Sequence, residues 1–459
     1  MWLRGVGVGA LALVWMTPLW AQHGDHEGEA TKHQEQPEAA HAVGPAGIPM
    51  QRTGSGTAWQ PDLSPMYGRH LRAGAWSPMV HGSVFLQYVD AGGRRGDEQL
   101  GATTWFMGMA KRRFAGGELG VRGMFSLDPL TVGTCGYPLL LATGETCEGE
   151  ALHDRQHPHD LLMEITAEYA RELAPGLALT LYGGPAAEPA LGPVAFPHRL
   201  SALANPLAPI GHHWQDATHI AFGVVTAGVF GRAWKLEGSV FNGREPDEAR
   251  YDLDLNGLDS YSGRIWWLPS ERVAFQVSLG HLEEAEVDVD VGGRRDVDRT
   301  TASLTYHHPV SRGGLWATTL VWGRNREQDE RTHSALVETS LNLQEQHLFF
   351  ARGEIVQKPA GDLDVSDAGG FTVDRRFTVG SGSLGYMRQI GIGGLVGGIG
   401  ARAGLAFVPD ALESFYGSQP FGFVVFAHLR PAPMRMDVMS RQDRPEHEAR
   451  GRSPARPHH

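Results

Sequence analysis

Histidine and aspartate residues with the chemistry of metal ligands gather in two short stretches of the chain. The first stretch contains His153, His157, His159 and Asp160, and the second contains His198, His212, His213, Asp216 and His219. Imidazole combined with carboxylate suits zinc, copper or nickel, and a nearby carboxylate can fix the tautomer of a ligating ring. These residue types therefore predict a site for a divalent metal, zinc or copper, to which both stretches contribute.

The same residues allow two other interpretations. Arg155, Glu188 and Arg199 could join the histidines in a structural network of hydrogen bonds and ion pairs. A His/Asp pair could instead activate water or a serine such as Ser201, as general-base catalysis requires. No HExxH, GxSxG or P-loop sequence accompanies the clusters. The sequence therefore assigns no catalytic residue and favours a protein that is not an enzyme.

The composition indicates an exported protein without a nucleic-acid partner. The chain has 459 residues and a net charge of −12, whereas nucleic-acid surfaces need clustered positive charge. Residues 1–21 have the pattern of a secretory signal peptide, and the His-rich residues 22–75 are predicted to be disordered. Export leads to an oxidising compartment, where Cys135 and Cys147 are expected to form a disulfide bond.

From residue 76 to residue 430 the chain consists of short segments of alternating polarity. Tyr261, Ile265 and Trp267 share one face of such a segment, and Ser260 and Arg264 occupy the other. An apolar face opposite a small or charged face is typical of a strand between lipid and a polar lumen. About 16 strands (roughly 14–18) are predicted. They lie at 78–90, 101–114, 117–127, 161–174, 177–186, 217–230, 233–243, 258–268, 271–283, 299–309, 314–324, 333–342, 346–357, 373–389, 394–407 and 421–430.

The connections between these segments alternate between short and long. Short links such as Ala115-Gly116 match tight turns, and long links such as 128–160 and 187–216 match outer loops. Loops of this length are uncommon unless they serve a function. The sequence predicts an all-β fold, a transmembrane antiparallel β-barrel whose long outer loops fold over or into the lumen. These loops would bring the two histidine stretches together at one rim.

Charged residues of both signs fall on the predicted inner faces of the strands. The predicted pore-lining residues are Arg122, Glu164, Glu168, Lys235, Glu237, Arg264, Arg352, Glu354 and Arg402. Their mixed charge indicates a narrow pore more than a strongly ion-selective one. Acidic outer loops would attract cations, as calcium sites or through ions that bridge lipopolysaccharide. The acidic residues concerned are Asp247, Glu248, Asp252, Asp254, Glu283, Glu284, Glu286, Asp288 and Asp290.

The architecture and the last strand resemble bacterial outer-membrane porin-like β-barrel proteins, of an exported type with no assigned activity. Residues Phe421 to Arg430 are similar to the C-terminal strand signal of this class, although a Pro- and Arg-rich tail, residues 431–459, follows them. The resemblance covers residues 76–430. It implies a location in the outer membrane of a Gram-negative bacterium, with the N-terminal segment and the disordered tail in the periplasm. The implied partners are lipid, lipopolysaccharide and the barrel-assembly machinery, and the implied state is a homotrimer or a monomer.

The sequence thus predicts an outer-membrane pore or channel for small polar solutes or metal ions. Its His/Asp-rich mouth links it to the transport or handling of copper or zinc. A barrel-borne hydrolase with a His/Asp pair at the rim is one alternative. A structural or adhesion barrel with a plugged lumen is the other.

Overall fold

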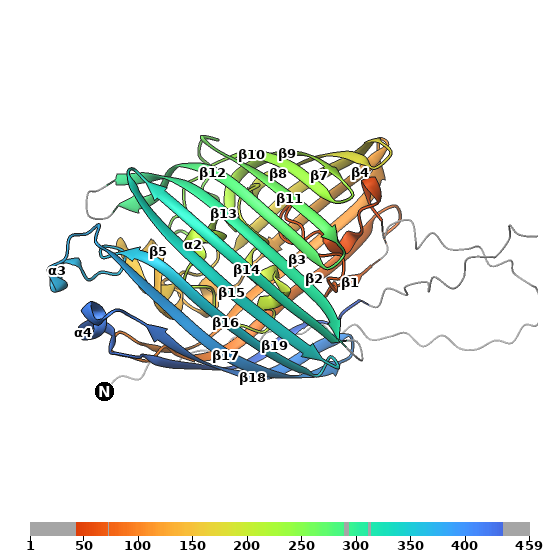
Figure 1. Cartoon of the computed structure of the whole chain (residues 1–459). Coiled ribbons are helices and arrows are strands. Elements are labelled where there is room, and N and C mark those ends of the chain that lie inside the picture. The colour runs from red at the N-terminus through yellow and green to blue at the C-terminus, as the bar shows by residue number, and fades with distance from the viewer. Residues whose placement is uncertain (1–42, 72, 289–292, 311–313, 435–459) are drawn as a thin grey trace, which may run out of the picture. The chain divides into compact units, whose positions relative to one another are not determined.

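The segments of alternating polarity pair in sequence order and close into a barrel (Figure 1). The structure, a computed structural model, describes residues 43–71, 73–288, 293–310 and 314–434. Sixteen antiparallel strands form the wall, and the pairing of β19 with β2 closes it. The wall strands are β2 (Ser77–Asp90), β3 (Glu98–Phe114), β4 (Gly117–Phe125), β7 (Leu162–Ala174), β8 (Leu177–Ala187), β9 (Ala221–Gly231), β10 (Trp234–Phe241), β11 (Ser260–Ser270), β12 (Val273–Asp288), β13 (Gly293–Val310), β14 (Gly314–Glu327), β15 (Glu330–Leu343), β16 (His347–Pro359), β17 (Arg376–Ile392), β18 (Leu395–Phe407) and β19 (Phe421–Pro431).

The two faces of the wall have opposite character, as the alternation predicts. On β11, Tyr261, Ile265 and Trp267 point outward and are 59%, 55% and 54% exposed, whereas Arg264 points inward and is 0% exposed. Large apolar side chains are exposed in the same way on most other wall strands. A closed ladder leaves no edge, and an apolar outer belt requires lipid around it. The chain is therefore a transmembrane barrel of the outer-membrane type.

The predicted strand count and the predicted alternation of links are confirmed. Tight turns join β3 to β4 and β7 to β8, and Ala115 and Gly116 take the positive φ angles, 47° and 77°, that the first of these turns requires. The long links gather at the other rim. We call the two rims the short-turn end and the long-loop end.

Three segments fold inside the wall. The N-terminal insert (residues 43–67) contains η2 (Pro45–Gly47) and η3 (Met50–Arg52). The hairpin insert (residues 126–161) contains α1 (Asp128–Thr131) and the two-stranded sheet of β5 (Tyr137–Cys147) and β6 (Glu150–Gln156). The inner loop (residues 188–220) contains η4 (Phe196–His198), η5 (Leu200–Ala202), α2 (His212–Gln215) and η6 (Ala217–His219). Figure 1 shows β5 and α2 within the ring of wall strands.

The prediction that residues 22–75 are disordered is wrong for the N-terminal insert. Ala58 and Trp59 are buried and pack against Phe230, Trp266 and other wall residues near the short-turn end. The short strand β1 (Arg69–His70) then pairs with β2. The insert has no sequence periodicity of its own, so its order depends on the wall that surrounds it.

Several other predictions can be placed on the structure. The disulfide bond between Cys135 and Cys147 is present, with 5.4 Å between the Cα atoms, and it ties the start of β5 to its end. The signal peptide, residues 22–42 and the tail beyond residue 434 lie outside the described residues. Within the described ranges, no helix is long and apolar enough to cross a membrane. The remaining short elements are α3 (Ser366–Gly369), η7 (Asp410–Leu412) and α4 (Glu413–Tyr416) in the outer links.

Candidate metal site in the lumen

Five histidine rings from the hairpin insert and the inner loop form one group, which we call the imidazole cluster. Its members are His157, His159, His212, His213 and His219. The ring centroids of His212 and His219 are 5.2 Å apart, those of His159 and His219 are 5.4 Å apart, and those of His157 and His213 are 5.5 Å apart. Rings that ligate one tetrahedral ion with metal–nitrogen bonds of about 2.0–2.1 Å have centroids roughly 5 Å apart. The two predicted stretches therefore meet, but among the described residues the groups whose ligand atoms lie within 4.8 Å of one another include only His213 of these rings.

The Nδ1 atom of every ring in the cluster is held by an oxygen atom. Three carboxylates hold His159, His212 and His213: the Nδ1–oxygen distances are 2.8 Å to Asp128, 2.7 Å to Asp216 and 2.6 Å to Glu245. The Nδ1 atom of His157 lies 3.2 Å from Glu145, and that of His219 lies 2.8 Å from the backbone oxygen of Asp216. Metal-ligating histidines are oriented in this way in known metal sites.

The opposite nitrogen of four of these rings has no partner. The Nε2 atoms of His157, His212, His213 and His219 are buried and make no hydrogen bond within the described part of the chain. A buried polar atom without a partner costs on the order of 1–3 kcal/mol. Because Nδ1 donates its proton to an oxygen atom, each Nε2 carries the free lone pair that a metal ion would need.

Electrostatics keep these imidazoles neutral. Burial, reinforced by the neighbouring His213 and Arg250, lowers the pKa of His157 well below its usual value. Burial, reinforced by Arg299, lowers the pKa of His213 to about 3. Although burial acts to raise the pKa of Asp216, the nearby Arg199 and His212 outweigh it, so this carboxylate stays ionised. A neutral imidazole beside an ionised carboxylate is the form that binds metal.

Three residues of the predicted site lie outside the cluster. His153 is near Arg95, Asp154 and Asp364 at the long-loop end. His198 packs against Trp105 and His81, with centroids 4.6 Å and 6.4 Å away. Asp160 is buried, and its carboxylate lies 3.7 Å from Arg250. The predicted site is therefore divided. Five of its histidines and Asp216 come together, whereas His153, His198 and Asp160 contact other residues.

The sequence interpretation missed the carboxylates that orient the rings. Asp128, Glu145 and Glu245 lie in links that the sequence predicts as loops, and no spacing relates them to the histidines. Ser201, the predicted alternative nucleophile, has no hydrogen bond to a histidine in the described structure, because its hydroxyl is hydrogen-bonded to Glu338 and Thr319. Glu338 in turn binds Arg199, which is the ion pair to be expected of a structural network.

The predicted pore-lining residues all lie on the inner wall, where each is buried or half-buried. Three of them hold the N-terminal insert: Arg122 donates to the backbone oxygen of Gly56, and Lys235 and Arg264 donate to Thr57. Arg352 donates to the inner loop at the backbone oxygen of Leu207. The inserts therefore narrow the lumen by binding the charges that face it.

Some of the acidic outer residues also come together. One oxygen atom from each of Asp247, Asp252 and Asp254 lies within 4.8 Å of the other two, and His281, Glu283 and Asp296 form a similar group. Calcium binding at the acidic loops stays a prediction. Asp290 and the side chain of Asp288 lie outside the described residues.

A cavity of about 160 Å³ lies next to the imidazole cluster. His157, His159 and His198 line it together with side chains of the N-terminal insert, among them Met50 and Met66. The cluster is therefore adjacent to open space inside the barrel, on the side that faces the N-terminal insert.

No protein-family model matches the chain, and no curated protein matches it in sequence. Solved structures with a similar fold include the outer-membrane channel DcaP of Acinetobacter baumannii, with 10% identity, a TM-score of 0.47, and coverage of 80% of this chain and 100% of that one. An OmpF of Salmonella typhi in complex with daunomycin has 10% identity and a TM-score of 0.46, and the match covers 79% of this chain and 100% of that one. The chain is a closed antiparallel β-barrel. An anion-selective porin from Comamonas acidovorans is similar as well, with 10% identity and a TM-score of 0.45, and the match covers 77% of this chain and 99% of that one. Association of this barrel as a homotrimer, or its existence as a monomer, stays a prediction.

Proposed function

We propose that the protein is an outer-membrane channel for small polar solutes or metal ions, and that its imidazole cluster binds a divalent transition metal, zinc or copper. The short-turn end would face the periplasm and the long-loop end the exterior, as in barrels of this type. The observation that carries the metal proposal is the set of four buried Nε2 atoms without a partner, on rings that are each held through Nδ1.

The chemistry of the ligand set supports a transition metal over calcium. Calcium takes oxygen ligands, whereas neutral imidazole suits zinc and copper. Asp216 orients two rings at once, His212 through its carboxylate and His219 through its backbone oxygen.

Zinc binding to the purified full chain in detergent tests the metal proposal. A variant with His157→Gln, His212→Gln and His219→Gln is expected to lose about 100-fold or more in Zn(II) affinity, because ligand loss exceeds the 10–100-fold cost of losing a supporting contact. The matched control is His333→Gln, since His333 is exposed on the outer face of β15. Unchanged affinity in the triple variant would show that the cluster is a structural network.

Conductance in planar bilayers tests the channel proposal. The full chain is expected to give small conductance steps that Zn(II) reduces, because the cluster lies in the narrowed part of the lumen. The triple histidine variant should conduct without this zinc effect. Absence of any conductance, with or without metal, would remove the channel proposal.

A barrel with a plugged lumen is the second candidate, and the N-terminal insert favours it. Backbone oxygens of Gly56 and Thr57 accept hydrogen bonds from inner-wall cations, so the insert is fixed where solute would pass. Deletion of residues 43–67 distinguishes the two functions. A silent full chain and a conducting deletion variant would support the plugged barrel, whereas conductance of the full chain would exclude it.

A further inference from the structure

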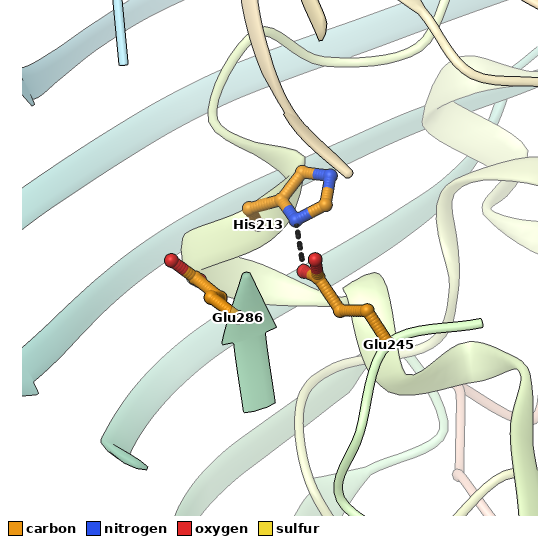
Figure 2. Close-up of side chains that lie close together, drawn as sticks. All are labelled: His213, Glu245 and Glu286. Carbon is orange, nitrogen blue, oxygen red and sulfur yellow. Dashed lines mark hydrogen bonds and ion pairs between the residues drawn. The ribbon is translucent and has the colours of Figure 1, made fainter. Parts of the chain in front are cut away.

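Three potential ligands from separate segments meet near the long-loop end, on the outer side of the imidazole cluster. His213 comes from α2 of the inner loop, Glu245 from the link between β10 and β11, and Glu286 from the end of β12. One ligand atom from each lies within 4.8 Å of the other two. Figure 2 shows the Nδ1 atom of His213 directed toward Glu245, with Glu286 beside them. We call this group the rim triad.

The carboxylate of Glu286 is close enough to Arg299 and Arg295 for attractive charge interactions. Within the described part of the chain its carboxylate makes no hydrogen bond and no ion pair. Glu245 binds His213, with 2.6 Å between carboxylate oxygen and Nδ1. Two carboxylates beside one imidazole, one of them unpaired, are a suitable ligand set for Zn(II).

The triad is accessible from the exterior. A cavity of about 360 Å³ is lined by Glu145, Glu245, Asp247 and Glu248, with Arg294 as its basic residue. A smaller cavity is lined by Glu145, Glu245 and His213, together with the basic residues Arg244 and Arg299. Because both cavities share Glu145 and Glu245, a cation in the outer cavity can reach the triad past these two carboxylates.

His213 belongs to both the rim triad and the imidazole cluster, through opposite ring nitrogens. Its Nδ1 atom faces Glu245, whereas its Nε2 atom is buried without a partner on the other side of the ring. The ring lies 5.5 Å from that of His157 and packs against Gly144, where a Cβ atom would overlap it. A neutral imidazole has one free lone pair at a time. The ring can therefore serve one side or the other, but not both together.

We propose that His213, Glu245 and Glu286 form a second Zn(II) site, which receives the cation from the outer cavity and delivers it to the imidazole cluster. The inference rests on the proposed function, because the cluster is the destination. While the ion is on Nδ1, the ring proton resides on Nε2. When the ion moves to the Nε2 side, that proton is released and Nδ1 takes up a proton that it donates to Glu245. The bonds of the ion to Nδ1 and to the two carboxylates break as the bond to Nε2 forms. Water accepts the proton that leaves Nε2 and supplies the proton that Nδ1 gains.

Equilibrium dialysis and stopped-flow uptake of Zn(II) by the full chain test this inference. The wild-type chain is expected to bind two ions, one at the triad through Nδ1 of His213 and one at the remaining rings of the cluster. Glu286→Gln should bind one ion and take it up about 10-fold more slowly, since a charged ligand at the entrance is removed. Glu245→Gln keeps an acceptor for His213 and should give the same result. The control is Glu150→Gln, an exposed carboxylate at the first residue of β6.

The outcomes separate the rim triad from the imidazole cluster. The triple histidine variant of the cluster should keep one ion, bound at the triad. If Glu286→Gln and Glu245→Gln bind two ions at the wild-type rate, the triad is not a site and the cluster is unaffected. If the triple histidine variant still binds two ions, the cluster proposal is wrong and the triad is no longer an entrance to it. A wild-type chain that binds no Zn(II) would overturn both.

Discussion

Two buried polar regions of the lumen differ in how completely their hydrogen bonds are made. Near the short-turn end, every side-chain nitrogen of Arg264 has a partner: Nε lies 2.9 Å from Glu237, and the terminal nitrogens lie 2.9 Å from the backbone oxygen of Gly192 and 3.0 Å from the hydroxyl of Thr57. We call Arg264 and these partners the arginine lock. In the imidazole cluster, by contrast, four Nε2 atoms have none in the described chain.

The completeness of hydrogen bonding distinguishes a structural polar region from one that is available for a ligand. Every nitrogen of Arg264 has a partner, and the Oε2 atom of Glu237, which makes no hydrogen bond in the described chain, is paired with Lys235 at 3.2 Å. Such a network stabilises the fold, whereas incomplete satisfaction costs free energy unless something else supplies the missing partners. Both regions are covered by inserted segments, so burial alone does not separate them. Removal of a residue should therefore affect stability strongly in the lock and weakly in the cluster.

Arg264→Leu should have the largest effect on stability. The substitution leaves Glu237 buried with only Lys235 as an ionic partner and removes the contact with Thr57. Loss of one member of a buried ion pair costs about 3–5 kcal/mol. Reversible urea unfolding of the refolded barrel in detergent measures the change.

Arg388→Leu is the control for this prediction, because Arg388 is exposed on β17. Its effect should stay within about 0.5 kcal/mol, as for most surface substitutions. A comparable loss in both variants would show that the lock adds nothing specific.

The arginine lock contains residues whose positions the sequence predicted correctly and one whose position it did not. Alternation identified Arg264 as an inner residue and Tyr261 as an outer one, because a strand has period 2 and its two faces meet different media. Boundaries were less accurate where loops fold inward: the strand predicted at 217–230 begins at Ala221, since residues 217–219 form η6. Thr57, which completes the lock, comes from a segment whose polar sequence predicted disorder.

The candidate site was predictable only in part, for a similar reason. Residue type identified His157 and His212 as potential ligands, but not their neighbours. His153 is four residues from His157, yet its contacts are with Arg95 and Asp364. Contacts between side chains of separate loops produce no regular spacing that could be recognised in the sequence. Such contacts can be found only once the barrel has brought the loops together.

Glu188→Gln should have an intermediate, pH-dependent effect at the boundary of the lock. Burial raises the pKa of Glu188 to about 7, although Arg264 and Ser55 act in the opposite direction. The unfolded chain loses this proton near pH 4.5 and the folded chain near pH 7, so the folded chain binds more protons between these values. Wild-type stability should therefore fall from pH 4.5 to pH 7 by on the order of 1–3 kcal/mol.

The glutamine variant should lack this part of the pH dependence, because it has no proton to lose. Unfolding in urea at pH 5 and pH 8 measures the difference between the variant and the wild type. Equal pH slopes for the two proteins would mean that Glu188 is ionised in the folded chain over the whole range, and that the lock includes it as a full ion-pair partner of Arg264.

His219→Phe should have the smallest effect on stability and gives the sharpest test of the comparison. The substitution removes one hydrogen bond, from Nδ1 to the backbone oxygen of Asp216, which contributes roughly 1 kcal/mol. It also removes the unpartnered Nε2 atom, so the two effects offset each other and the free energy of unfolding without metal should change by less than about 1 kcal/mol. In the presence of Zn(II), the wild-type chain should gain stability and the variant should gain less, because a ligand that binds only the folded state stabilises it in proportion to its affinity. A loss of more than about 2 kcal/mol without metal would place His219 with Arg264 among the structural residues, and the imidazole cluster would then differ from the lock in composition but not in role.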